Sequence, residues 1–188
     1  METLTKVSEE EYLLLESTAT FKSEYHAGEI VAMAGAQRNH NLVIANLMFL
    51  LGLCLRRKCR IFPSDMLLKL PECEKYVYPD VMIICGEEKL EIRKGIDVLL
   101  NPAIVIEVLS ESTAHYDRDE KLRCYLTLES LKECWLIDSE KAEIISYKRS
   151  LNNNDEWIMY INKNINEKIK IGECEIDIQE IYLDTRLK

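Results

Sequence analysis

The chain has 188 residues, of which 47% are hydrophobic and 30% charged, and its formal net charge is −9 at pH 7. That length and composition suit one domain with a sizeable core. The negative charge argues against attachment to nucleic acid by bulk charge, since such binding depends on Lys and Arg displacing counterions from phosphates. The densest basic cluster, Arg56–Arg60 (RRKCR), is either a phosphate-contacting edge or a solvated helix end.

The cysteines and the apolar segments indicate in which cellular compartment the protein is expected. Seven cysteines are scattered without a CxxC pair, which predicts neither a disulfide framework nor a zinc site. We therefore expect reduced core cysteines in a cytoplasmic protein. The N-terminal segment is too charged for a signal peptide, and the longest apolar stretch, residues 42–55, is short for a bilayer span and contains Asn46. A soluble protein with no membrane partner is expected.

The first third of the chain predicts a helix, a hairpin and a second helix. Ser8 and Glu11 form a capping-box pattern for a short helix over residues 8–17. Residues 21–35 (FKSEYHAGEIVAMAG) predict a small hairpin that turns at residues 26–28. Residues 37–57 are the most helix-like segment, with leucines spread over several turns.

Strand-like runs dominate the rest of the chain. In order they are CRIF (59–62), DMLLKL (65–70), YVYPDVMIIC (76–85), AIVIEVLS (103–110), ECWLID (133–138), EIISYK (143–148) and EWIMYI (156–161). A charged connector precedes residue 103, a helix is expected from Ser112 or Thr113 to about Leu128, and residues 176–183 read as a short helix or coil. This order predicts an α/β or α+β domain around a mixed sheet, with residues 76–85 and 103–110 as buried central strands.

Two carboxylates interrupt these apolar strands. Glu107 has Val105 and Leu109 as neighbours on its own face, and Asp80 follows Pro79, which suggests an interrupted or distorted strand. A buried carboxylate is costly unless it is paired or binds a metal. Together with waters, two carboxylates on successive core strands can hold Mg²⁺ or Mn²⁺. The alternative is that each carboxylate lies at a strand end beside solvent or an arginine.

A lysine in the following helix is the third unusual residue. When residues 114–128 are placed at about 100° per residue, Lys121 falls inside the apolar arc and Asp117 lies at its edge. From that position Lys121 can reach back toward Glu107. The alternative is an i,i+4 pair with Asp117, in which the lysine stem covers the core and the ammonium reaches solvent.

With these residues in hand, the chain resembles the Uma-type restriction endonuclease family, formerly a domain of unknown function, of the PD-(D/E)XK nuclease superfamily. The resemblance is carried by YHAGEIVAMAG, NHNLVIANL, YPDVMII, NPAIVIEVLSESTAHYDRDEKLRCY and ECWLID, and it covers about residues 8–160. It implies a restriction-endonuclease-like core, with a central mixed sheet flanked by helices. We expect one domain over residues 1–188, with an N-terminal helix and hairpin (8–35), a nuclease core (37–138), and C-terminal strands with a short helix (139–188).

The resemblance also implies roles for these residues. Asp80 matches the aspartate of the PD motif and Glu107 the acidic residue of the second half-motif, and both would be metal ligands together with the backbone carbonyl of Val108. The pattern's usual lysine position holds Leu109, and Lys121 matches the position to which the family moves this lysine. The expected catalytic set is therefore Asp80, Glu107 and Lys121.

Three upstream residues are accessory candidates. His40 in the long helix, Glu29 in the hairpin and Asp65 before a strand could supply a further acidic or proton-handling group. Their alternatives are a helix-end histidine, a glutamate exposed beside the Gly28 turn, and an edge-strand aspartate.

The leading hypothesis is an Mg²⁺- or Mn²⁺-dependent endonuclease that hydrolyses phosphodiester bonds in DNA. The main alternative is a catalytically inactive nuclease-fold module that binds DNA or protein. A small-molecule phosphodiesterase ranks last, because the chain has only six glycines and no glycine-rich phosphate loop. DNA is the expected partner, and a homodimer is expected because cutting two strands usually takes two sites.

Overall fold

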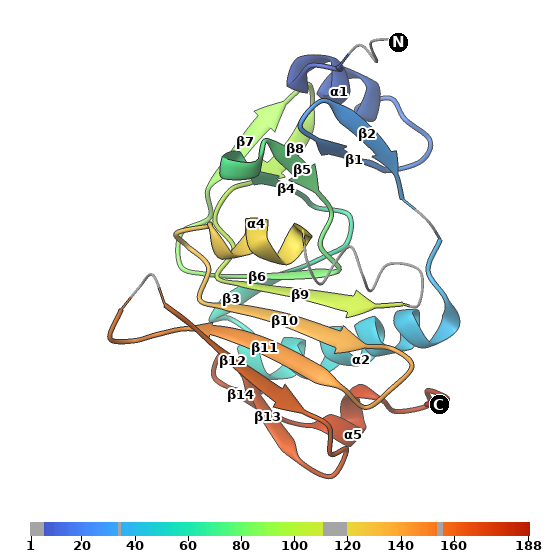
Figure 1. Ribbon diagram of the computed structural model, residues 1–188, viewed down its shortest axis with the longest axis vertical. Coiled ribbons are helices and arrows are strands. Elements are labelled where there is room, and N and C mark those ends of the chain that lie inside the picture. The colour runs from blue at the N-terminus through green and yellow to red at the C-terminus, as the bar shows by residue number, and fades with distance from the viewer. Residues whose placement is uncertain (1–5, 34, 111–119, 154–155) are drawn as a thin grey trace.

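The structure is a computed structural model that describes residues 6–33, 35–110, 120–153 and 156–188. The protein has an α+β fold. Six of the described strands form what we call the central sheet: β3 (Cys59–Pro63), β6 (Val81–Cys85), β9 (Ile104–Leu109), β10 (Glu133–Asp138), β11 (Ile144–Arg149) and β12 (Trp157–Asn162). Their order across the sheet is β12-β11-β10-β9-β6-β3, and β9 and β10 are parallel whereas the other neighbours are antiparallel. The mixed sheet predicted from the sequence is thus confirmed (Figure 1).

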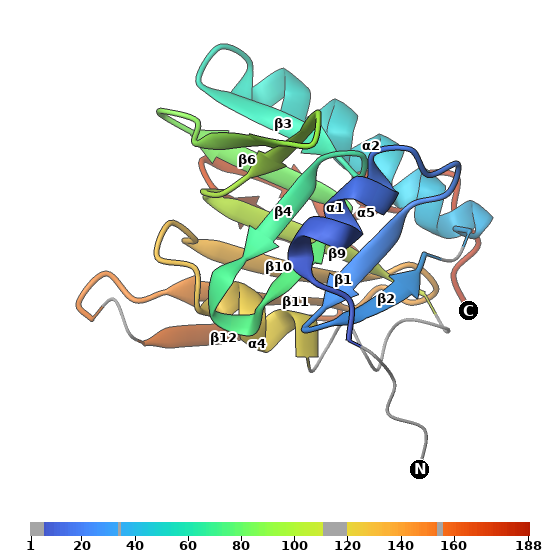
Figure 2. The same cartoon turned by 90° about the horizontal axis from the view of Figure 1, so that it is seen from above.

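Six further strands form a second sheet, which we call the outer sheet: β1 (Ser23–His26), β2 (Glu29–Ala32), β4 (Leu67–Leu70), β5 (Lys75–Val77), β7 (Leu90–Arg93) and β8 (Ile96–Leu99). Their order is β2-β1-β5-β4-β8-β7. A hairpin of β13 (Lys168–Ile171) and β14 (Cys174–Asp177) stands apart from both sheets. Seen from above, β4, β1 and β2 lie in front of the central strands (Figure 2).

Helices cover both faces of the central sheet. The described helices are α1 (Glu9–Glu16), α2 (Arg38–Leu55), α4 (Leu122–Leu126) and α5 (Ile178–Ile181), with a 3₁₀ turn, η1, at Pro71–Cys73. On one face α2 and α5 pack with β14 in a core that includes Ile106 and Trp135. On the other face α4 packs in a second core that also takes Leu68 and Val77 from the outer sheet. The inner strands β6, β9 and β10 are therefore buried on both faces, as their apolar sequences require, whereas the edge strand β12 is mostly exposed.

The long helix α2 is amphipathic in a simple way. Its buried residues Val43, Leu47, Leu51 and Leu55 recur every four positions and form one stripe against the sheet. By length and composition alone α2 also qualifies as a candidate membrane span, a test that the core helix of a soluble protein passes as well. The buried stripe packs in the core against the central sheet, and 28% of the helix is buried.

The N-terminal predictions are confirmed in detail. The Ser8 hydroxyl accepts a hydrogen bond from the Glu11 N–H at 3.2 Å, and the Glu11 carboxylate accepts one from the Ser8 N–H at 2.9 Å, which completes a capping box for α1. The hairpin turns at Ala27 and Gly28, whose φ angles are +47° and +105°. A two-residue turn in which both residues have positive φ matches the twist of the strands in a hairpin. Position 28 favours glycine also because a Cβ there would lie only 2.8 Å from Lys6.

Residues 76–85 form two strands rather than one distorted strand. Val77 ends β5 in the outer sheet, and Val81 begins β6 in the central sheet. Pro79 lies in the link, where it has no N–H to give to either ladder. This crossover places Asp80 at the junction of the two sheets.

The expected charged connector holds β7 and β8, and the C-terminal region holds the β13–β14 hairpin; neither pair of strands was predicted. β7 alternates between exposed and half-buried positions, so its apolar signal is weak. The strands β7 and β8 are joined through Lys94 and Gly95, both with positive φ. The first part of the helix expected from residue 112 or 113 lies within residues 111–119, outside the described residues.

The prediction of reduced cysteines was wrong. Three disulfides join Cys54 to Cys174, Cys59 to Cys85 and Cys73 to Cys124, and Cys134 is free and buried. The partners are 120, 26 and 51 residues apart, so their spacing carries no local signal. The register of β3 and β6, for example, places Cys59 directly opposite Cys85.

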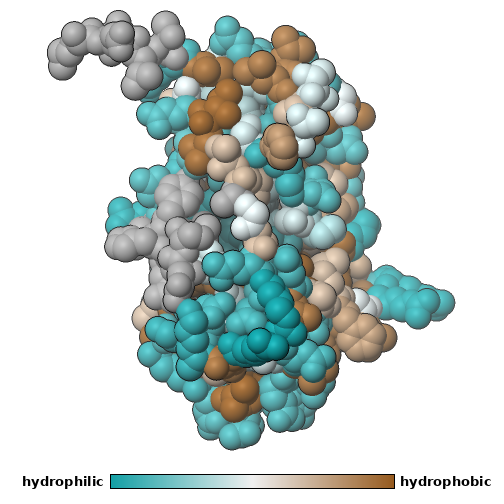
Figure 3. Space-filling model, turned by 90° about the vertical axis from the view of Figure 1, so that its right-hand side faces the viewer, coloured by the Kyte–Doolittle hydropathy of each residue, from teal (hydrophilic) through white to brown (hydrophobic). Residues whose placement is uncertain are grey.

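Strand β2 is the exposed edge of the outer sheet. All four of its residues, Glu29 to Ala32, are exposed, because only β1 pairs with it. Apolar side chains gather over the upper part of the face in Figure 3, and the exposed apolar residues of this N-terminal region include Phe21, Ile30 and Val31. Glu29 is exposed to solvent because it lies on this edge strand.

Candidate functional site

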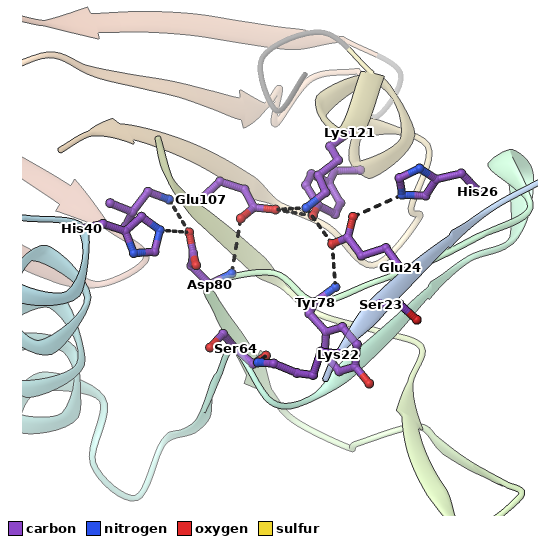
Figure 4. A network of polar contacts seen from close by, with 12 residues as sticks. Lys22, Ser23, Glu24, His26, His40, Ser64, Tyr78, Asp80, Glu107 and Lys121 are labelled. Atoms are coloured by element: carbon purple, nitrogen blue, oxygen red, sulfur yellow. Dashed lines mark hydrogen bonds and ion pairs between the residues drawn. The ribbon is translucent and has the colours of Figure 1, made fainter. Parts of the chain in front are cut away.

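Asp80 and Glu107 meet where strands β6 and β9 part. The antiparallel register pairs Val81 with Ile106, so Asp80 and Glu107 come next in register and project to the same face. The Asp80 N–H donates to Glu107 Oε2 at 3.3 Å, and the Val108 N–H donates to Asp80 Oδ2 at 2.7 Å (Figure 4). Each carboxylate is thus held by the backbone of the other's strand.

The two carboxylates differ in access to solvent, and a histidine contacts the more open one. The side chain of Glu107 is 4% exposed and that of Asp80 15%. His40, in the first turn of α2, places Nε2 3.2 Å from Asp80 Oδ2. The structure therefore brings the accessory candidate His40 to the pair.

Lys121, the N-cap residue of helix α4, and Tyr125 within α4 both contact Glu107. Lys121 Nζ lies 3.6 Å from Glu107 Oε1, and the Tyr125 hydroxyl donates a hydrogen bond to the same oxygen. The two residues are four positions apart, so they share one face of the helix. Burial, and then the nearby Glu107 charge, raise the pKa of Tyr125 well above its usual value, so the phenol stays a donor.

Glu24 of β1 completes the cluster, although no sequence pattern singled it out. Its Oε1 lies 2.8 Å from Lys121 Nζ and accepts a hydrogen bond from the Tyr78 N–H at 3.1 Å, and its Oε2 lies 3.1 Å from His26 Nε2 (Figure 4). Burial alone would raise the pKa of Glu24, but His26, Lys121 and the Tyr78 N–H together lower it. Glu24 is thus held as a carboxylate.

The other two accessory candidates lie at the surface. Glu29 is exposed on the edge strand β2. The Asp65 side chain is 83% exposed and forms an ion pair with Lys22 at 2.7 Å. Glu24 of β1, and not Glu29 of β2, is the hairpin acid that contacts Lys121. Asp117, the alternative partner of Lys121, lies outside the described residues.

The site residues that were missed have explanations in the fold. Glu24 alternates with His26 in β1 and with Lys22 just before it, and such a polar face is normally taken to point to solvent. Here the face is covered because Lys121 and the Tyr78 backbone pack against it. Tyr125 lies in the apolar arc of its helix. Its hydroxyl was the one feature in the sequence that indicated a polar contact.

The oxygen ligands at the junction suit a hard divalent cation that keeps water in its remaining coordination positions. Among the described residues, no three His, Cys, Asp or Glu side chains form a group that could hold a metal ion. Asp80 and Glu107 provide two carboxylates, and the Val108 carbonyl points to the same side of β9 as its N–H, which contacts Asp80. Mg²⁺ is commonly bound by one or two carboxylates with several waters, so these donors fit Mg²⁺ or Mn²⁺ if water completes the shell.

Two known proteins are similar in sequence to this chain. The chain is 41% identical over 150 residues to "Uncharacterized protein sll1609" of Synechocystis sp., a match that covers 79% of this chain and 83% of that one. It is 34% identical over 155 residues to "Uncharacterized protein slr1290" of the same organism, covering 82% and 79% of the two chains.

A solved structure shares the fold. A crystal structure from Anabaena variabilis, described as "a putative nuclease belonging to DUF820", matches with a TM-score of 0.71 at 18% identity and covers 94% of this chain and 97% of that chain. The family model Uma2, described as "Putative restriction endonuclease", matches residues 9–174. The chain therefore belongs to the Uma2 family and has a nuclease-like fold.

Proposed function

We propose that this protein is an Mg²⁺- or Mn²⁺-dependent endonuclease that hydrolyses phosphodiester bonds in DNA. The observation that carries the proposal is the reciprocal bonding of Asp80 and Glu107, which fixes two carboxylates side by side with an ammonium group 3.6 Å from one of them. Family membership and the fold agree with nuclease chemistry.

The proposed roles follow from the position of each group. A cation held by Asp80, Glu107 and the Val108 carbonyl would activate water and offset phosphate charge. Lys121 is a buried donor beside Glu107, suited to orient the attacking water or to stabilise negative charge on the phosphate in the transition state. His40 orients the Asp80 carboxylate from the more open side.

The basic cluster Arg56–Arg60 plays no part in this proposal. Lys58 pairs with Glu173 and Arg60 with Glu88, as expected for a solvated helix end. Along α2 the cluster begins about 24 Å from His40, at 1.5 Å per residue. Local contacts near the carboxylates, rather than bulk charge, would therefore hold the DNA.

The test is cleavage of supercoiled and linear DNA by purified protein with Mg²⁺ or Mn²⁺. We expect Asp80→Asn, Glu107→Gln and Lys121→Ala each to reduce cleavage by about 100-fold or more, in line with the loss of electrostatic stabilisation in other enzymes. Glu29→Gln is the matched control, because it removes an exposed hairpin carboxylate from the edge strand. Full activity in the three site variants would contradict the proposal.

The same samples separate the proposal from a catalytically inactive module. A module would bind DNA or protein with no Mn²⁺ uptake in calorimetry and no cleavage. We also propose a homodimer, since double-strand cleavage uses two sites. Light scattering coupled to gel filtration measures this, and a monomer in the presence of DNA would contradict it.

A further inference from the structure

Lys121 is shared unevenly between two buried carboxylates. Its ammonium lies 2.8 Å from Glu24 Oε1 and 3.6 Å from Glu107 Oε1. Only 8% of the Lys121 side chain is exposed, with 6% of Glu24 and 4% of Glu107. Because solvent screens such a group weakly, the position of the one ammonium changes how much negative charge each carboxylate presents.

Glu24 is well placed to hold the ammonium on its side. The Tyr78 N–H and His26 Nε2 engage its two oxygens, which fixes the carboxylate in place. Its strand, β1, is paired on both sides, with β2 and with β5. The anchor is therefore a hydrogen-bonded strand and not a mobile side chain on a surface loop.

Glu107 has other donors that do not neutralise it. The Asp80 N–H and the Tyr125 hydroxyl both donate to its oxygens, and neither carries a full charge. A Lys121 ammonium drawn fully onto Glu107 would compete with a divalent cation for that carboxylate. The longer contact keeps the competition weak.

We infer that Glu24 is a positioning residue that draws the Lys121 ammonium away from Glu107, so that the Glu107 carboxylate keeps the charge that a divalent cation needs. The inference rests on the proposed function, because it concerns cation binding at Asp80 and Glu107. It assigns the outer sheet a part in the site: β1 sets the affinity of a cation held between strands of the central sheet.

The first test is calorimetric titration of metal-free protein with Mn²⁺, without DNA. Glu24→Gln keeps the size of the side chain and removes its charge, so Lys121 is expected to close on Glu107 and Mn²⁺ affinity to fall about tenfold. The Mn²⁺ concentration that supports half-maximal cleavage should rise by the same factor, with the rate at saturating Mn²⁺ nearly restored.

Glu16→Gln is the matched control. Glu16 is also a buried carboxylate of the N-terminal region, but it accepts hydrogen bonds from Ser23 and from the Tyr78 hydroxyl. We expect its variant to change Mn²⁺ affinity less than about twofold, because the hydrogen bonds that Glu16 accepts come from Ser23 and the Tyr78 hydroxyl and not from Lys121. A tenfold loss in both variants would show a general effect of the region and overturn the inference.

A double-mutant cycle with Lys121→Met separates positioning from a structural role. If Glu24 acts through the ammonium, Glu24→Gln has no further effect on Mn²⁺ affinity once Lys121 is gone. An equal loss in both backgrounds overturns the inference. Should Lys121→Met not fold, a crystal structure of Glu24→Gln decides: the Lys121–Glu107 distance shortens to about 3 Å if the inference holds, and an unchanged distance overturns it.

Failure of the inference and failure of the proposed function are distinguishable. Wild-type protein that neither takes up Mn²⁺ nor cleaves DNA overturns the proposed function. Wild-type protein that does both, with unchanged Mn²⁺ affinity in Glu24→Gln, overturns only the role of Glu24.

Discussion

The hydrogen bond from Tyr125 to Glu107 supports a quantitative prediction about stability. Tyr125 is fully buried and its hydroxyl donates to a carboxylate oxygen, so Tyr125→Phe removes one donor and leaves the ring packed. A hydrogen bond to a charged group contributes about 1.5–3 kcal/mol, against about 1 kcal/mol for a neutral pair. Since the Asp80 N–H and Lys121 remain beside the carboxylate, we expect a loss of about 2 kcal/mol.

The assay is urea unfolding of metal-free protein near pH 7. The matched control is Tyr182→Phe, because Tyr182 is buried and its hydroxyl donates to the neutral carbonyl of Asp138 at 3.0 Å. We expect this control to lose about 1 kcal/mol. A loss of 2 kcal/mol lowers Tm by about 4–8 °C in a chain of this length.

The contribution of the Glu107 charge is isolated by repeating Tyr125→Phe in a Glu107→Gln background. There the acceptor is neutral, and we expect the cost to fall to about 1 kcal/mol. If Tyr125→Phe costs no more than Tyr182→Phe, or costs the same in both backgrounds, the hydroxyl is not a significant partner of the carboxylate.

Three further outcomes are expected. Stability should fall as pH rises above about 10, because the pKa values of six buried tyrosines are raised in the folded state. Unfolded tyrosine then ionises while folded tyrosine does not, and each costs up to about 1.4 kcal/mol per pH unit. The six are Tyr12, Tyr25, Tyr76, Tyr78, Tyr125 and Tyr182. Circular dichroism between pH 8 and 12 measures this, and a flat profile would contradict the burial. Breaking the Cys54–Cys174 disulfide, which spans 120 residues, should lower the unfolding free energy by about 5 kcal/mol in the chain-entropy model; unfolding of Cys54→Ser, Cys174→Ser protein tests it, and a loss under 1 kcal/mol would count against that model here. Asp65→Asn should leave the cleavage rate within about twofold, since its ion pair with Lys22 is exposed, and a large loss of cleavage would return Asp65 to the site.

The residues at the junction that could be predicted are those that break a local rule. Asp80 and Glu107 stand out as charges in apolar strands, and Lys121 stands out as a charge in the apolar arc of a helix. Because burying an unpaired charge is costly, each implied a partner. The register of β6 and β9 and the fold of α4 bring these three together.

What could not be predicted depends on which segment covers which face. Glu24, which the sequence did not single out, is buried because Lys121 and the Tyr78 backbone contact its carboxylate. The split of residues 76–85 between two sheets and the pairing of distant cysteines, such as Cys54 with Cys174, are likewise long-range results. Local patterns describe strands and helices one at a time, and they do not state how those elements dock.

The crossover at Pro79 has a consequence for the order of folding. The Asp80–Glu107 contact closes 27 residues of chain, whereas the contact between Glu24 and Tyr78 closes 54. Longer loops cost more entropy to close, and contacts between distant segments slow folding. A nascent molecule with only its central sheet formed would hold Asp80 and Glu107 without Glu24, so full cation affinity should appear only after the outer sheet has docked, and Mn²⁺ uptake during refolding would time that last step.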